Sequence, residues 1–362
     1  MNVRLRLPIR PGLSAARLTA FAAAAILVAA CSTVPASTAP STGSTASGAA
    51  SAEPGTGVVT KGGSLNIDFA TYNPLSLIIK DQGWLEKELA DQGVTVNWIQ
   101  SAGSNKANEA LRAGAIDVGS TAGSAALLAR SNGSPIHVID IYSQPEWSAV
   151  VVPANSPITS VADLKGKRIA ATKGTDPYFF LLQALETAGL KPTDVTVEIL
   201  QHADGWAALQ NSSVDAWAGL DPIMAGAEQA GAKLLYRNVD FNSYGFLNAT
   251  ESFLKEKPDL AQAVVDAYEH ARAWAAAHPD ETVQILATVA SLDRAIAKKV
   301  IDERSNLDVD PVPGSAQVEI LKRIGPIFVS SGDVSSQADI DEALATLIDD
   351  TYAKRANPGR FE

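Results

Sequence analysis

The sequence predicts a two-lobed α/β protein, a clamshell in which two strand-and-helix lobes are joined by two crossovers and followed by a helical C-terminal part. Three observations lead to this prediction. Short apolar strands alternate with helical stretches, which is typical of largely parallel sheets covered by helices on both faces. The alternation starts again after about residue 150. The part of the chain that can fold, from about residue 64 onward, has roughly 300 residues, the upper limit for a single core.

The first 30 residues predict a secretory signal peptide. Four arginines and no acidic residue precede an apolar stretch at residues 18–30. A basic start, a short apolar run and then small residues are typical of signal peptides. The apolar run is shorter than the roughly 20 residues that a membrane span needs. A signal anchor that is never cleaved is the alternative.

The apolar stretch ends in the sequence VAAC at residues 28–31, and Cys31 is the only cysteine of the chain. This ending resembles the bacterial lipobox, in which the cysteine is lipidated and becomes the new N-terminus. A lone cysteine in an exported protein cannot form an internal disulfide, so lipidation is the preferred interpretation and a free or buried thiol the alternative. Acyl chains on Cys31 would hold the protein at a membrane surface. Residues 31–63, mostly Ser, Thr, Ala, Pro and Gly, predict a flexible tether.

The first lobe is predicted from residues 64–150. Its strands are expected at residues 65–70, 94–99, 116–120 and 136–142, where apolar residues form short runs or alternate with polar ones. Helices are expected from Pro74 to near Gly93, over residues 107–113 and from residue 124 through Arg130. Ser104 is expected to cap the second of these helices, because Ser is a favoured N-cap residue.

The second lobe is predicted from residues 151–245. The apolar run at residues 148–153 is interpreted as the first crossover, and residues 244–247 as the return. Between them, strands are expected before Thr172 and at residues 195–200, 216–220 and 233–236. Pro177 stands near the start of a helix that runs to Gly189, a position that Pro favours. From residue 246 to 362 the chain returns to the first lobe and reads as helices interrupted by prolines.

The charge of the chain excludes nucleic acid as a partner. The formal net charge is −11, and the predicted signal peptide carries four arginines, so the exported part is more acidic still. An acidic protein is repelled by nucleic acid and by anionic membrane surfaces. A small anionic ligand remains compatible, because a local site can be positive on an acidic protein.

The cleft between the lobes is the predicted ligand site, because ligands of open α/β sheets bind beyond the carboxyl ends of the strands. Three turns precede helices at that edge, at residues 101–105, 120–124 and 173–178. Backbone N–H groups and the positive end of a helix dipole suit an anion at such turns. Ordinary helix capping is the alternative for each hydroxyl. The ligand contacts proposed from these turns, and from the cap before Pro74, are Asn73, Ser101, Gly103, Ser120, Thr121, Gly174 and Thr175.

Carboxylates and aromatic residues beside the predicted cleft extend this list. Glu146, Asp176 and Asp221 suit a zwitterion that carries an amine, although Asp176 and Asp221 are also explained as a helix cap and a turn residue. If Asp176 binds an amine, its replacement by Ala should abolish binding of a zwitterionic ligand and spare anions that lack an amine. The aromatic residues proposed to line the ligand's carbon chain are Trp147, Tyr178 and Trp206. Trp217, inside a strand, is interpreted as core.

Catalytic motifs are not evident in the sequence. The four histidines lack metal-ligand spacing, and there is no Gly-x-Ser-x-Gly elbow, phosphate-binding loop or catalytic cysteine. A binding protein is therefore favoured. Because some enzymes use a bilobal fold, a small-molecule lyase is the enzyme alternative, and a structural surface lipoprotein is a third.

Three segments stand out along the chain: EALRAGAIDVG at residues 109–119, SVADLKGKRIA at 160–170 and SVDAWAGLDP at 213–222. They resemble motifs of the sulfonate, taurine and nitrate group of periplasmic binding proteins. The agreement runs from about Leu65 to Asp349, with these motifs in the family's order and spacing. Two segments depart from it: STAGS at residues 120–124, where TGDAP is common, and GTDPY at 174–178, where GSSAHY is commoner.

The resemblance implies a type 2 periplasmic binding protein fold and no cofactor. It implies a monomer that captures a small organic sulfonate, alkanesulfonate or taurine-like, outside the cytoplasmic membrane. Its partners would be an ABC permease and, through it, the ATPase. Because the two departures lie where the ligand is expected, a nitrate-like anion and a pyrimidine precursor of thiamine remain alternative ligands.

Overall fold

The computed structural model describes residues 62–362, which lie in one compact unit. The predicted signal peptide, Cys31 and nearly all of the predicted tether lie outside the described residues. The first strand begins at Gly63, where the tether was expected to end. Among residues 62–362, no helix combines the length and apolar character needed to cross a membrane.

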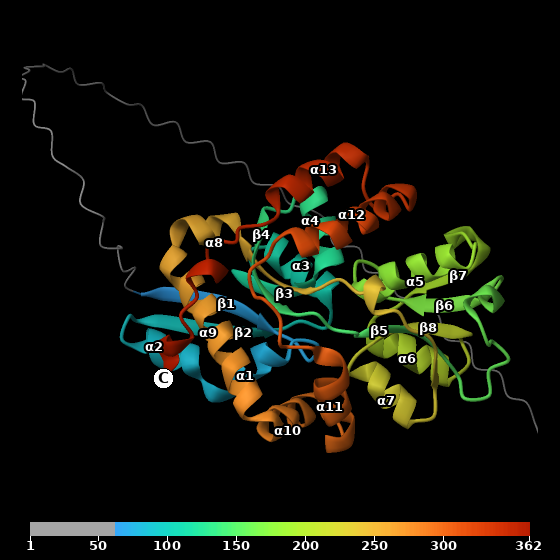
Figure 1. The fold of residues 1–362 in the computed structure, drawn as a ribbon, viewed down its shortest axis with the longest axis horizontal. Helices are drawn as coiled ribbons and strands as arrows, with labels where there is room; N and C mark the ends of the chain where they lie inside the picture. Colours follow the sequence, from blue (N-terminus) through green and yellow to red (C-terminus); the bar gives the residue numbers. More distant parts are fainter. Residues whose placement is uncertain (1–61) are drawn as a thin grey trace, which may run out of the picture. The chain divides into compact units, whose positions relative to one another are not determined.

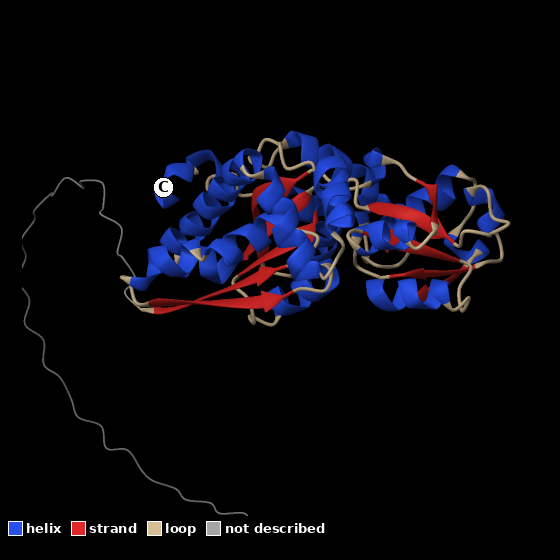
Figure 2. Cartoon of the chain, turned by 90° about the horizontal axis from the view of Figure 1, so that it is seen from below, coloured by secondary structure: helices blue, strands red, loops and turns tan. Residues whose placement is uncertain are grey.

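Two five-stranded sheets form the centres of two lobes (Figures 1 and 2). The first sheet has the order β2-β1-β3-β10-β4, and the second the order β7-β6-β8-β5-β9. The strands of the first sheet are β1 (Gly63–Phe69), β2 (Val94–Gln100), β3 (Val118–Ala122), β4 (Ile136–Ser143) and β10 (Gly245–Thr250). Those of the second are β5 (Ser148–Val152), β6 (Arg168–Ala171), β7 (Thr196–Ile199), β8 (Ala216–Leu220) and β9 (Lys233–Tyr236). All the strands expected from the sequence are present, with ends shifted by a few residues.

Helices alternate with the strands as the sequence predicts. Those of the first half of lobe I are α1 (Pro74–Gln82), α2 (Trp84–Ala90), α3 (Ser104–Arg112) and α4 (Gly123–Ser131). Those of lobe II are α5 (Asp176–Thr187), α6 (His202–Gln210) and α7 (Ile223–Gln229). The C-terminal part consists of α8 (Glu251–Glu256), α9 (Pro258–Ala277), α10 (Pro279–Ala290), α11 (Arg294–Val300), the π-helical turn η4 (Ile301–Ser305), α12 (Ser315–Ser330) and α13 (Gln337–Thr346). Five short 3₁₀ turns complete the chain: η1 (Val161–Leu164), η2 (Pro192–Asp194), η3 (Val239–Phe241), η5 (Ala353–Arg355) and η6 (Pro358–Phe361).

Both sheets are mixed: four strands of each run in one direction and one runs against them, so the expected parallel arrangement holds for all but one strand of each sheet. β1 is parallel to β2 and β3, and β6 is parallel to β7 and β8. β10 is antiparallel to β3 and β4, and β5 is antiparallel to β8 and β9. The two antiparallel strands are those that follow a crossover. Each enters its sheet from the side of the other lobe, which reverses its direction relative to its neighbours.

The crossovers lie a few residues before the predicted ones. The run at residues 148–153 is not a crossover but β5, which lies wholly in the second sheet. The chain passes between the lobes at residues 144–147 and returns at residues 237–244, just before β10. The apolar character of residues 148–152 reflects complete burial of β5 in lobe II.

Two details of the first lobe also differ from the sequence expectations. The long helix expected after Pro74 is divided into α1 and α2 at Gly83, whose φ of +64° ends α1 in a left-handed cap. Ser104 is the first residue of α3 and not its N-cap; Gly103 holds that position. The Ser104 hydroxyl accepts a hydrogen bond from the backbone of Ala122 instead, at 2.9 Å. It therefore ties α3 to the end of β3.

The hydrophobic cores show how the lobes are joined. One core fills lobe I between its sheet and α1, α9 and α10, and a smaller one lies in lobe II around Trp217, which confirms the interpretation of that residue as core. A further core continues from Phe246 of β10 through Phe179 of α5 to Phe328 of α12. α12 contacts α4 of lobe I and α5 of lobe II, so apolar packing joins the lobes along this side.

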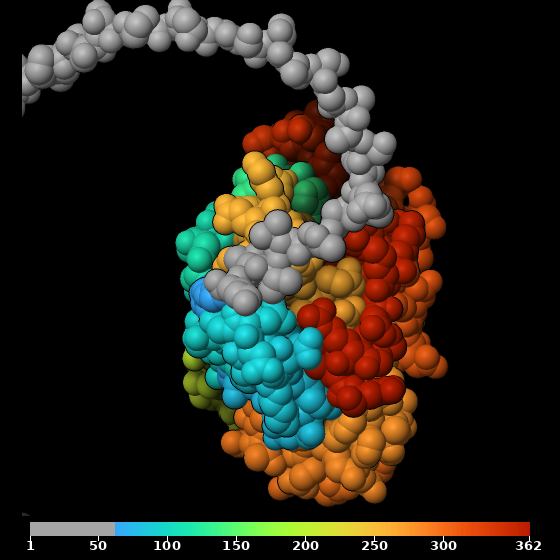
Figure 3. All heavy atoms as spheres, turned by 90° about the vertical axis from the view of Figure 1, so that its left-hand side faces the viewer, coloured from blue at the N-terminus to red at the C-terminus, as the bar shows by residue number. Residues whose placement is uncertain are grey.

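The C-terminal residues pack on lobe I. Arg360 forms ion pairs with Glu88 of α2 and Asp266 of α9, at 3.0 and 3.2 Å. Figure 3 shows the red C-terminal residues beside the cyan residues of α2 and β2 on this face. The last residues of the chain therefore lie against lobe I, whereas α12 contacts both lobes.

Candidate functional site

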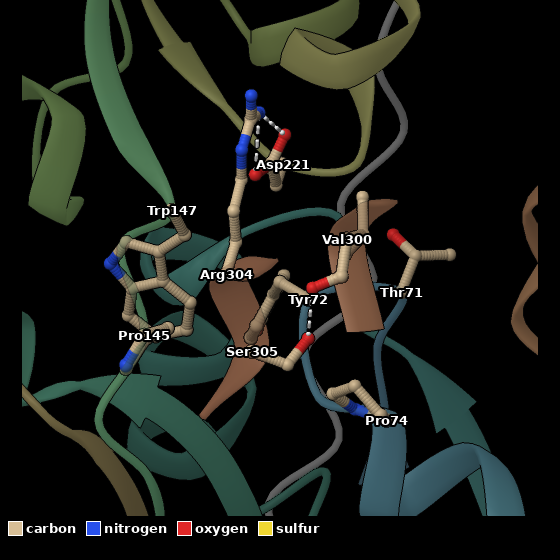
Figure 4. Close-up of a pocket in the computed structure, with 9 residues that line it drawn as sticks. All are labelled: Thr71, Tyr72, Pro74, Pro145, Trp147, Asp221, Val300, Arg304 and Ser305. Atoms are coloured by element: carbon tan, nitrogen blue, oxygen red, sulfur yellow. Dashed lines mark hydrogen bonds and ion pairs between the residues drawn. The ribbon is translucent and has the colours of Figure 1, made fainter. Parts of the chain in front are cut away.

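A narrow pocket lies where the two lobes and the first crossover meet (Figure 4). Its walls come from the loop after β1, the crossover, the end of β8 and the turn η4. The lining residues are Thr71, Tyr72, Pro74, Pro145, Trp147, Asp221, Val300, Arg304 and Ser305. The cavity is about 10 Å³, about the space that one water molecule needs. The lobes are therefore closed on each other, and a larger ligand can enter only after they open.

Arg304 crosses from η4 of lobe I to lobe II in this pocket, as Figure 4 shows. Its Nη1 donates to both carboxylate oxygens of Asp221 at 3.1 Å, and its Nη2 contacts Glu228 of α7. The side chains of Arg304 and Asp221 are only 1% and 4% exposed. Burial raises the pKa of Asp221 to about 6, although the Arg304 charge opposes this. The pair is a buried electrostatic link between the lobes.

Aromatic rings form one wall of the pocket. Tyr72 and Trp147 meet edge to face, with ring centroids 6.0 Å apart and an interplanar angle of 87°. The Tyr72 hydroxyl donates to the backbone oxygen of Ser120 at 3.0 Å. The Trp147 indole donates to Asp176 at 2.8 Å. These hydrogen bonds fix both rings, so the wall is rigid in the closed form.

Asp176 links both lobes and both crossovers. Its carboxylate accepts hydrogen bonds from the hydroxyl of Ser124 on α4, the indole of Trp147 in the first crossover, and the hydroxyl and backbone N–H of Ser243 in the second. The distances are 2.6 to 2.8 Å. Burial raises the pKa of Asp176, and these donors oppose the rise. Asp176 is the first residue of α5 and Thr175 its N-cap, so the capping function expected of Asp176 is corrected.

Asp68 of β1 lies beneath the cleft and was not among the sequence-predicted residues. It accepts hydrogen bonds from the backbone and hydroxyl of Ser120, at 2.9 and 3.1 Å. Burial raises the pKa of Asp68 to about 7, opposed by hydrogen bonds from Ser101 and Ser120. The two serine hydroxyls proposed as ligand contacts are therefore directed at Asp68. A carboxylate inside an apolar strand was the sequence signal that could have identified it.

The start of α3 in lobe I meets the start of α6 in lobe II. A Cβ atom placed on Gly103, the N-cap of α3, would lie 3.1 Å from Nε2 of His202, the first residue of α6. The same point is 2.9 Å from Oδ1 of Asn105. Neither helix start has a side-chain cap. His202 and Asn105 were missed as ligand contacts. His202 comes two residues after the strand predicted at residues 195–200, so it lies in a turn between a strand and a helix, like the turns from which the other contacts were proposed.

The second predicted turn, at residues 120–124, is closed by the return crossover. The backbone N–H of Gly123 donates to Tyr244, and that of Ser124 donates to the Ser243 hydroxyl at 2.9 Å. The hydroxyl of Thr121 donates to Ala122 and accepts from Asn248. These groups are occupied by the protein itself, so α4 offers fewer free donors than the start of α3.

The remaining predicted residues divide between the cleft and other places. Trp147 and Asp221 line the pocket, and Gly174, with a φ of +77°, lies against Asn105 across the lobe boundary. Thr175 is buried, and its hydroxyl donates to the backbone of Thr172. Asn73 caps α1, accepting from Ser76 and donating to the Tyr268 hydroxyl.

Only Trp147 and Asp221 of the predicted residues line the pocket, and three others make contacts elsewhere. Glu146 pairs with Arg237, so the two crossovers are joined there by a contact of 2.5 Å. Tyr178 lines a separate groove between α5 and α12. Trp206 packs against Trp217 and lines a depression on lobe II beside α7. Glu146 lies in a loop, as expected, whereas Tyr178 and Trp206 lie within α5 and α6, and the sequence could not show which way their side chains point.

Comparisons with known proteins agree with this architecture. A model of the family described as NMT1/THI5 like matches residues 77–282. A protein assigned as aliphatic sulfonates-binding in Escherichia coli (strain K12) is 30% identical over 272 residues, which cover 74% of this chain and 84% of the relative. The alkanesulfonate-binding protein SsuA of Xanthomonas axonopodis pv. citri, solved with bound MOPS, superposes with a TM-score of 0.67. It is 25% identical, and the match covers 80% of this chain and 96% of that one.

An enzyme also shares the fold. The desulfurization enzyme DszB is 16% identical, with a TM-score of 0.60 over 80% of this chain and 97% of that one. At this identity the likeness shows the fold alone. The two-lobed architecture therefore carries both binding and catalysis in known proteins, and the choice between them must rest on the site.

Proposed function

Since this chain belongs to the NMT1/THI5-like family, we propose that it is the solute-binding subunit of an ABC importer and captures a small organic sulfonate between its lobes. The aliphatic sulfonates-binding relative and the alkanesulfonate-binding structure support the ligand class. Because these relatives are binding proteins, they also support the proposal that this protein captures and releases its ligand without changing it chemically.

The observation that carries this proposal is the meeting of two helix starts across the cleft. α3 and α6 come from different lobes, and neither start is capped by a side chain. The first N–H groups of a helix have no partner within the helix and carry partial positive charge, which suits an anion. Arg304 is already paired with Asp221 and Glu228, so the two helix starts are the uncompensated positive groups in this proposal. An anion held between the helix starts would contact both lobes and favour their closure.

Ligand binding requires the lobes to open and close. The closed pocket is too small for a sulfonate, and the crossovers at residues 144–147 and 237–244 are the segments that a hinge motion would bend. Charged contacts that span the lobe boundary would break on opening; they include Arg304 with Asp221 and Glu228, Lys299 with Glu228, and Lys173 with Asp333. A ligand that binds the closed form more tightly than the open form shifts the equilibrium toward closure.

A thermal-shift screen of the purified protein tests the ligand class. Ethanesulfonate, longer alkanesulfonates and taurine are expected to raise the melting temperature by several degrees. A ligand that binds only the folded state adds about 2.7 kcal/mol at one hundred times its dissociation constant. Nitrate, sulfate and a thiamine-type pyrimidine are the comparison ligands. A response to one of these, with none to any sulfonate, would keep the importer function and replace the ligand.

We further propose that the protein is exported and anchored by a lipid on Cys31. The VAAC ending of the apolar stretch supports this, as does the absence of any other cysteine in the sequence. In bacteria fed an alkyne analogue of palmitate, the wild-type chain is expected to take up the label and to sediment with membranes. Cys31→Ser should be unlabelled and recovered in the soluble fraction. Equal sedimentation of both proteins, with no label in either, would contradict the anchor.

A further inference from the structure

His202, like Gly174, brings lobe II against the start of α3. It is 2% exposed, and its Nε2 has no hydrogen-bond partner among residues 62–362. The Oδ1 atom of Asn105 is buried and also without a partner within this part of the chain. Both atoms lie within about 3 Å of the point where a Cβ of Gly103 would stand. A buried polar atom without a partner costs about 1–3 kcal/mol, so closure without a ligand is penalised here.

The hydrogen bonds of the imidazole define its neutral form. The Thr172 hydroxyl donates its single proton to the backbone oxygen of Leu200, at 2.7 Å. It lies 3.2 Å from Nδ1 of His202 and can only accept from that atom. The neutral ring therefore carries its proton on Nδ1 and directs the lone pair of Nε2 into the cleft. A second proton would turn Nε2 into a donor without disturbing the contact with Thr172.

The charged side chains near His202 do not stabilise its protonated form, so only a bound anion can do so. On its own helix Asp204 is exposed. On α3, Lys106 is paired with Glu109, and beyond β6, Lys173 is paired with Asp333. None of these charges perturbs the pKa of His202, which burial alone lowers to about 3 in the closed form. The positive ends of α3 and α6 also oppose a charged ring. The imidazole is thus neutral in the closed cleft until an anion lies beside it.

We propose that His202 binds the anionic ligand directly, taking up one proton from solvent as the lobes close and donating an Nε2–H hydrogen bond to it. This inference rests on the proposed function and deepens it. The open cleft exposes the ring, whose ordinary pKa is about 6.5. A sulfonate oxygen at Nε2 offsets both the burial of the ring and the repulsion from the helix starts. The protonated ring then donates a charge-assisted hydrogen bond. Only an anionic ligand can stabilise this charged ring, so the site selects anions.

Titration calorimetry of the purified protein with ethanesulfonate tests the proton uptake. The bound state holds more protons than the free state, so binding weakens as pH rises from 6.0 to 8.5, approaching tenfold per pH unit at its steepest. At pH 7.0, buffers with different ionisation enthalpies should report uptake of up to one proton per ligand. His202→Gln keeps an N–H donor but does not titrate, so its binding should be weaker than wild type at pH 6 and nearly independent of pH.

The control is His278→Gln, which removes a histidine that stacks on Trp274 at the end of α9 with ring centroids 4.5 Å apart. It should keep the wild-type pH profile. Ethanesulfonate binding without proton uptake, or with the same pH profile in His202→Gln, would overturn this inference and leave the proposed function standing. Absence of any binding of ethanesulfonate or taurine would overturn both. If the Gln variant fails to fold, His202→Asn takes its place, because the raised pKa values of Asp68 and Asp221 at the cleft make proton uptake by the wild type alone insufficient to identify His202.

Discussion

Replacing Arg304 with methionine is expected to lower the free energy of unfolding by about 3–5 kcal/mol, the usual cost of removing one partner from a buried ion pair. The substitution leaves Asp221 buried without its bidentate partner and Glu228 without a contact to Arg304. Chemical denaturation at pH 7 measures the loss. Because Arg304 belongs to lobe I and both carboxylates to lobe II, the same substitution should favour the open form of the cleft.

The loss should depend on pH in a defined direction. Burial already raises the pKa of Asp221 in the folded protein to about 6, and the Arg304 charge holds it down. Without that charge the folded pKa rises further, while the unfolded value stays near 3.9. Between these two pKa values the folded variant binds more protons than the unfolded chain, so its free energy of unfolding falls as pH rises. The deficit relative to wild type should therefore be larger at pH 8 than at pH 5.

Arg294→Met is the matched control for this experiment. Arg294 pairs with Asp280 at 2.6 Å, but the two side chains are 47% and 80% exposed. Exposed ion pairs contribute about 0–1 kcal/mol, so this variant should unfold nearly like wild type and show little pH dependence of the difference. Equal small losses in both variants would mean that the Arg304 contact contributes no more than a surface pair.

The importance of Arg304 could not be predicted from the sequence, whereas that of Asp221 could. Asp221 follows an apolar strand and precedes Pro222, so its position at the edge of a sheet is a local property. Arg304 lies 83 residues further along, in a region that reads only as successive helices. Periodicity identifies helices and strands, but it does not show which side chains meet when two lobes close. The same reason explains why the partners of His202 and Asp68 were missed.

The carboxylates show a second limit of sequence reasoning. Glu146, Asp176 and Asp221 were correctly expected in or beside loops near the crossovers, and the amine-binding hypothesis was built on that position. In the structure each is engaged by the protein: Glu146 by Arg237, Asp221 by Arg304, and Asp176 by four donors. The number of hydrogen bonds that a carboxylate already accepts is a tertiary property, and it decides whether a ligand amine can compete.

Replacing Asp176 with alanine is expected to cost about 3 kcal/mol or more of unfolding free energy, since each buried donor left without an acceptor costs about 1–3 kcal/mol. Four donors from α4 and both crossovers lose their acceptor. The lobes are then held less firmly at the hinge, so binding of taurine and of ethanesulfonate should weaken together. This differs from the amine hypothesis, in which only taurine is affected.

Asp163→Ala is the matched control, because it removes a carboxylate with the same number of hydrogen-bond donors that is exposed and not buried. The Asp163 carboxylate also accepts from four groups, the backbone and hydroxyl of Thr159 and of Ser160, at 2.9 to 3.1 Å, but it is exposed. Water can replace Asp163 for those donors, so the loss should be much smaller than that of Asp176→Ala. Calorimetry with taurine and ethanesulfonate on both variants then decides the function of Asp176. If Asp176→Ala lost taurine alone and unfolded like Asp163→Ala, the carboxylate would be an amine ligand; parallel loss of both ligands with a large stability deficit identifies it as the link that joins the lobes.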